Sequence, residues 1–98
     1  MADKTLIERI GDCPIAAKLP PHMLQGLERY VDHKIKGGSF LHAALSNDLK
    51  EAAGQADDTN KRLLWEYCYV FYNHIPLGAW GSPENVQQWL SSKAVTDG

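Results

Sequence analysis

The chain has 98 residues, of which 44% are hydrophobic, so it is long enough for one domain with a modest core that needs neither disulfides nor a metal. Ten lysines and arginines against twelve aspartates and glutamates give a net charge of -2 without a long run of either sign, which disfavours a broad phosphate-binding surface. No run approaches the ~18 apolar residues of a membrane span, and the charged start MADKTLIERIGDC is unlike a signal peptide. Cys13 and Cys68 match no disulfide framework or zinc spacing, so we expect reduced thiols in a soluble intracellular protein.

Residues 1–18 are predicted to form an irregular N-terminal extension. Within it, Leu6, Ile7 and Ile10 share one side of a short helix or single turn that Gly11 would stop. The prolines that follow bias their predecessors away from helix, so the connection to the next element is expected to be irregular.

The first strong helical pattern begins at Pro21, a residue type that suits a helix start. Apolar residues at positions 23, 24, 27, 30 and 31 form one stripe, and the glycine pair at 37–38 is expected to supply a left-handed stop. A second helix is predicted from Ser39 to about residue 54. Its apolar face contains Leu41, Ala44, Leu45, Leu49 and Ala52. Asp48 falls inside that stripe and is an anomaly there.

A third helix is predicted after Gly54, with Asp57 or Asp58 as its N-cap. Its segment LLWEYCYVFY has too many large side chains for a narrow stripe, so we expect a central helix contacted from more than one side; a central strand is the alternative. After the loop LGAWG, the segment SPENVQQW begins a fourth helix, and residues 91–98 are expected to fray. The sequence therefore predicts an all-α single domain, residues 1–98, that is a compact bundle of four main helices with a possible short N-terminal helix.

Motifs for catalysis or metal binding are weak. The segment DDTN lacks the glycine and distal glutamate of a calcium loop, and the four histidines have no zinc spacing. Cys68 is expected to be buried in the aromatic helix, and Cys13 has no evident activating neighbour. The segment KGGSF could present amides to an anion, but a plain helix junction is the preferred explanation. We therefore predict no enzyme, no metal and no cofactor.

Five residues are candidates for a ligand or partner site. Trp80 either plugs the core, which is the preferred interpretation, or offers a stacking surface. Tyr72 belongs to a surplus of aromatic side chains that cannot obviously all fit inside a domain of this size. Asn47, Asp48 and Asn60 either form a buried polar network that clamps the second helix to the third, or line a cleft and bind the hydrogen-bonding edge of a ligand.

Three segments carry a resemblance to a known group of proteins. LPPHMLQGLERYV, KGGSFLHAALSNDLKEAAGQADDTN and HIPLGAWGSPENVQQWL resemble small proteins of about this length encoded by tailed bacteriophages and prophages. The resemblance covers residues 19–90. It implies an accessory phage protein in the cytoplasm of the bacterial host that acts by stoichiometric binding, including inhibition of host defence.

Three hypotheses for function follow. The preferred one is non-enzymatic binding of a host protein or a small nucleotide-like ligand, as a homo-oligomer that buries some of the surplus aromatic side chains. The alternative is a nucleic-acid-binding accessory protein that uses basic residues 34, 36, 61 and 62, although the acidic balance disfavours it. The third places a hydrolase or metal enzyme around Asp48, Asp57 and Asn60.

Overall fold

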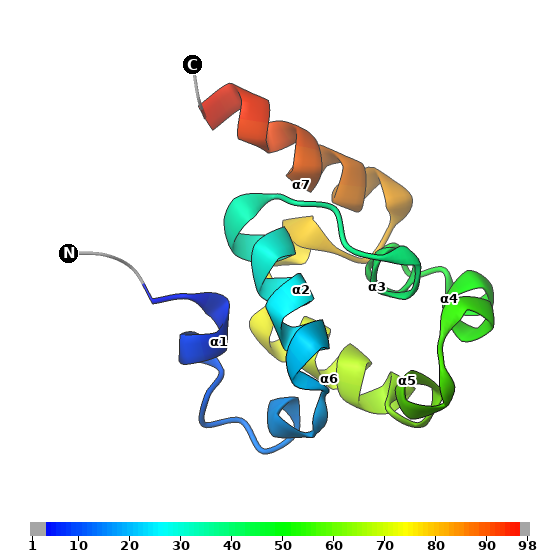
Figure 1. The fold of residues 1–98 in the computed structure, drawn as a ribbon. Coiled ribbons are helices and arrows are strands. Elements are labelled where there is room, and N and C mark those ends of the chain that lie inside the picture. Colours follow the sequence, from blue (N-terminus) through cyan, green and yellow to red (C-terminus); the bar gives the residue numbers. More distant parts are fainter. Residues whose placement is uncertain (1–3, 97–98) are drawn as a thin grey trace.

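The computed structural model describes residues 4–96, with side chains described up to residue 92. Within that range the chain forms seven α-helices, two single-turn 3-10 helices and no strand (Figure 1). The predicted all-α class is confirmed. The count of four main helices is not confirmed, because the second and third predicted helices are each divided in two. The radius of gyration, 13.0 Å, agrees with the ~13 Å expected of a compact domain of this length.

The helices fold around one core. In Figure 1, α7 crosses the top of the molecule above α2 and α3, α4 and α5 lie at the right, and α1 lies at the opposite side. The most extensive contacts between elements join α3 to α4, η2 to α7 and α1 to α2. In chain order the elements are α1 (Leu6–Arg9), η1 (Ala16–Lys18), α2 (Pro21–His33), α3 (Ser39–Leu45), α4 (Leu49–Gln55), α5 (Asp58–Arg62), α6 (Leu64–His74), η2 (Leu77–Ala79) and α7 (Pro83–Thr96).

The segment predicted as an N-terminal extension is tied to the core through α1. Thr5 and Glu8 form a capping box, in which each side chain accepts a hydrogen bond from the backbone amide of the other. Leu6 is completely buried, and its amide donates to the Asp32 carboxylate of α2 at 2.7 Å. Arg9 pairs with the same carboxylate at 3.5 Å. The possible short helix is therefore present, and α2 holds it in place.

The second predicted helix ends at Leu45 and restarts at Leu49. Asn47 has a φ of 63°, the left-handed conformation that asparagine tolerates better than most residues. Asp48 then caps α4, because its Oδ1 accepts a hydrogen bond from the Glu51 amide at 3.1 Å. The prediction that Asp48 lies inside one continuous apolar stripe is wrong. An aspartate followed three positions later by a glutamate is a helix-start signal, and it was present in the sequence.

The third predicted helix is divided at Leu63, which joins α5 to α6 with a φ of -107° and a ψ of 12°. Asp57 caps α5 by accepting a hydrogen bond from the Asn60 amide at 2.8 Å, as predicted for one of the two aspartates. The third predicted helix therefore begins where the sequence placed it and changes direction one turn later.

The last helix begins as predicted. The Ser82 hydroxyl accepts a hydrogen bond from the Asn85 amide at 3.1 Å, and a proline occupies the first helical position. α7 then continues to Thr96, into the tail 91–98 that was expected to fray, and the last two residues of that tail lie outside the described part of the chain.

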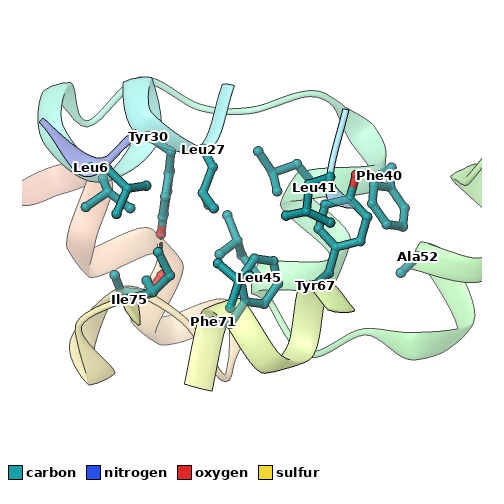
Figure 2. Packing of buried hydrophobic residues seen from close by; sticks show 14 of the residues in the cluster. Leu6, Leu27, Tyr30, Phe40, Leu41, Leu45, Ala52, Tyr67, Phe71 and Ile75 are labelled. Carbon is teal, nitrogen blue, oxygen red and sulfur yellow. Dashed lines mark hydrogen bonds between the residues drawn. The ribbon is translucent and has the colours of Figure 1, made fainter. Parts of the chain in front are cut away.

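The core lies where α2 and α3 face α6. Figure 2 shows Leu27 and Tyr30 of α2 and Leu41 of α3 pointing toward the layer that contains Tyr67 and Phe71 of α6. Each of these five side chains is at most 2% exposed. Burial of large apolar side chains of this kind is the main favourable contribution to the free energy of folding.

Candidate functional site

The outer side of α6 carries an exposed row of aromatic side chains, which we call the α6 aromatic face: Trp65, Tyr69 and Tyr72. Their spacing of i, i+4 and i+7 places them on one side of the helix. Their side chains are 62%, 37% and 75% exposed, respectively, and the ring centroids of Trp65 and Tyr69 are 5.5 Å apart. The buried residues of α6, at positions 67, 70 and 71, lie on the opposite side. One side of this predicted central helix is therefore exposed, whereas its buried residues contact several elements, among them α3 through Phe40 and the loop before α7 through Trp80.

An apolar groove lies beside this face, between α4 and α6. Leu49, Leu64 and Cys68 are among its lining residues, and Leu49 is 70% exposed. Cys68 is exposed, contrary to the expectation from its aromatic surroundings. The groove holds only about 50 Å³, whereas small-molecule sites have volumes of roughly 300 Å³ or more. A groove of this size suits one side chain of a protein partner.

Asn47, Asp48 and Asn60, which the sequence grouped together, form no common hydrogen-bonded network. Asn47 and Asp48 are exposed at the turn between α3 and α4. Asn60 is buried, and its side-chain oxygen accepts a hydrogen bond from the Tyr67 hydroxyl. That bond joins α5 to α6 and satisfies the buried amide oxygen within the domain.

Trp80 belongs to the packing of the core. Its side chain is half-buried, and its ring lies 5.8 Å from that of Phe71. The Asn85 side chain donates a hydrogen bond to the Trp80 carbonyl at 2.9 Å, which anchors the loop to α7. This placement favours the core plug over the stacking surface. Of the five predicted site residues, only Tyr72 lies on the α6 aromatic face.

A second, polar cavity of about 590 Å³ lies where α3, α4 and the loop before α3 meet. Its volume is within the range of small-molecule sites. His42 is half-buried there, and burial, followed by the charge of Lys36, lowers the pKa of its imidazole, which favours the neutral form. The polar side chains that line the cavity are Lys36, Ser39, His42, Ser46, Asp48 and Glu51. The sequence indicated parts of this site through the KGGSF segment and through Asp48, which was predicted as one alternative to line a cleft.

The loop that leads from α2 to this cavity has a different conformation from the one predicted. Lys34, rather than a glycine, takes the left-handed conformation at the end of α2, with a φ of 59°. Its ammonium group lies 3.6 Å from the centre of the Trp89 ring. Gly37 allows the loop to approach the Leu41 side chain closely, because a Cβ at position 37 would lie 2.9 Å from Cδ2 of Leu41 and would force that side chain to shift.

Comparison of the chain with known protein families, with curated proteins and with solved structures finds no match. The resemblance to small phage proteins therefore stays a prediction. Among the described residues, no three His, Cys, Asp or Glu side chains are placed to hold a metal ion together. None of the helices described has both the length and the apolar character needed to cross a membrane.

Proposed function

We propose that this chain is a non-enzymatic binding protein that forms a stoichiometric complex with another protein through the α6 aromatic face. The observation that carries the proposal is the exposure of Trp65, Tyr69 and Tyr72 on one side of α6. Tryptophan and tyrosine are enriched among the residues that contribute most to binding at protein interfaces. These large aromatic side chains lie outside the core and face solvent along one side of the helix.

The size of the surface fits the centre of an interface. α6 has 11 residues and is about 16 Å long, and each aromatic side chain can bury about 150–250 Å². Specific complexes bury about 800 Å² per partner, so neighbouring residues must contribute the remainder. Leu49 and the apolar groove beside α6 supply such a neighbouring surface.

The resemblance to phage accessory proteins makes the proposal more specific. On this resemblance, the partner would be a host protein in the bacterial cytoplasm, and binding would inhibit host defence. The nucleic-acid alternative has less support, because the chain has a net charge of -2 and the ammonium group of Lys34 already lies against the Trp89 ring. A gel shift that weakens steeply with salt would support that alternative instead.

The proposal is tested by comparing the wild-type chain with a Trp65→Ser, Tyr72→Ser double variant in capture from bacterial lysate followed by quantitative mass spectrometry. The matched control is Leu77→Ser, which removes a side chain that is 77% exposed on η2 and is not part of the α6 aromatic face. We expect the wild type and the control to retain the same protein at equal molar amounts, and the double variant to lose most of it. Because all three residues are exposed, the thermal stability of both variants should change little.

Light scattering of the purified chain separates a partner protein from self-association. A monomeric wild type that retains a partner supports the proposal. A wild-type dimer that the double variant converts to a monomer would assign the α6 aromatic face to a second copy of the chain and contradict the proposal. Equal retention of the partner by the double variant would also contradict it.

A further inference from the structure

We propose that the polar cavity between α3, α4 and the loop before α3 binds a small zwitterion, a molecule with an anionic group and an ammonium group a few bonds apart. The anionic group would lie at Lys36 and His42, and the ammonium group at Asp48 and Glu51. The cavity shares no lining residue with Trp65, Tyr69 and Tyr72 of the α6 aromatic face, so either proposal can fail without the other.

The cationic side of the cavity is available to a ligand. Lys36 is exposed, and the ion pair recorded among the described residues joins Arg9 to Asp32 instead. Lys36 belongs to the loop before α3 and His42 to α3, whereas Asp48 and Glu51 belong to the N-terminal end of α4. The positive and negative groups of the cavity therefore come from different elements, and the charge of Lys36 contributes, after burial, to the lowered pKa of the His42 imidazole.

The acidic side keeps free hydrogen-bond acceptors. One oxygen of Asp48 accepts from the Glu51 amide at 3.1 Å, and one oxygen of Glu51 accepts from the Gln55 side chain at 2.9 Å. Each carboxylate therefore has a second oxygen with no recorded partner in the described part of the chain. An ammonium group bound near both carboxylates would be attracted by each of them.

Ser46 gives an observation that does not depend on charge. It is only 7% exposed, it is a lining residue of the cavity, and its hydroxyl has no hydrogen-bond partner among the described residues. Buried hydroxyl groups nearly always have a partner. The hydroxyl itself has almost no accessible surface, so a polar group of a bound molecule would supply the missing partner after the Ser46 side chain rotates toward the cavity.

The test uses the full chain labelled with ¹⁵N and observed by amide NMR during titration. The zwitterionic probes are γ-aminobutyrate and O-phosphoethanolamine, which place the same ammonium group opposite a carboxylate or a phosphate. The probes with charge of one sign only are butyrate, inorganic phosphate and n-butylamine. We expect saturable shifts at the amides of Lys36, His42, Ser46 and Glu51, with at least one zwitterion bound about tenfold more tightly than the probes that carry only its anionic or only its ammonium group, a factor that corresponds to about 1.4 kcal/mol.

Charge-removing variants show whether the cavity is responsible. Lys36→Gln and Glu51→Gln should each weaken binding of the zwitterion by about tenfold. Lys50→Gln and Glu84→Gln remove the same charges outside the cavity and should leave the affinity unchanged. The amide spectrum of each variant reports directly whether it is folded.

Three results would overturn the proposal. One is the absence of saturable shifts with every zwitterion. Another is equal affinity for phosphate or butyrate alone, which would indicate a simple anion site. The third is an equal loss of affinity in the variants outside the cavity.

Discussion

Tyr30 joins α2 to the segment before α7, and removal of its hydroxyl tests the packing of the whole domain. The hydroxyl donates a hydrogen bond to the carbonyl oxygen of Ala79 at 2.6 Å, between buried residues 49 positions apart in the sequence. Tyr30→Phe keeps the ring but leaves the carbonyl without this donor. A buried polar group without its partner costs about 1–3 kcal/mol, so the free energy of unfolding should fall by about 2 kcal/mol. Each kcal/mol lowers the Tm of a domain of this size by about 4–8 °C.

Urea unfolding at neutral pH, followed by tryptophan fluorescence and circular dichroism, measures this loss. The matched control is Tyr72→Phe, which removes the same atom from a side chain that is 75% exposed and should change stability by less than about 0.5 kcal/mol. The comparison requires equal dependence of the free energy on urea in all three proteins. Equal unfolding midpoints for the two variants would refute the reasoning, because the bond to Ala79 would then contribute nothing.

Three further changes are predicted. Burial raises the pKa of the Tyr30 and Tyr67 hydroxyls, so the unfolded chain loses these protons first as the pH rises. The stabilising contribution of the two tyrosines is therefore full below a pH of about 10, and the free energy of unfolding falls above it by up to about 1.4 kcal/mol per pH unit for each tyrosine. Urea unfolding at alkaline pH measures this dependence, and Tyr30→Phe should reduce it. Gly37→Ala should lower the free energy of unfolding by about 1–3 kcal/mol, because its Cβ would lie 2.9 Å from Cδ2 of Leu41. Gly54→Ala lies inside α4, where an added Cβ meets nothing within 4 Å, and should raise the free energy of unfolding by about 0.5–1 kcal/mol. Calorimetry that shows a Tm shift of the same sign for both variants would contradict this. Ser46→Ala removes an unpartnered hydroxyl and should stabilise the chain by about 1 kcal/mol, and a lower Tm would show that the hydroxyl has a partner.

The parts of the fold that could be predicted are those that local chemistry determines. Asp57 and Ser82 cap helices because each side chain satisfies an amide three residues ahead, which requires nothing from the rest of the chain. The all-α class follows from apolar spacing of the same local kind. The break at Asn47 and Asp48 was also encoded locally, but an apolar stripe that continued across it concealed the cap signal.

The side of α6 that is buried could not be predicted, because it depends on contacts between distant segments. The sequence indicated more aromatic side chains than the core could hold and favoured a place in the core for Trp80, but it did not indicate that Trp65 would be exposed. Packing against Phe71 places Trp80 in the core, whereas no described element covers Trp65. The polar cavity is likewise formed by the meeting of α3, α4 and the preceding loop, and its residues have no common motif.

Asp48 connects the two proposed sites, since it lines both the polar cavity and the apolar groove beside α6. A partner that inserts a side chain into the groove would contact α4 from one side, and a zwitterion would contact the same helix from the other. Because Asp48 also caps α4, its replacement would disturb the helix and both sites together. The two proposals are therefore separated by residues that belong to one site only, Lys36 in the cavity and Trp65 on the α6 aromatic face.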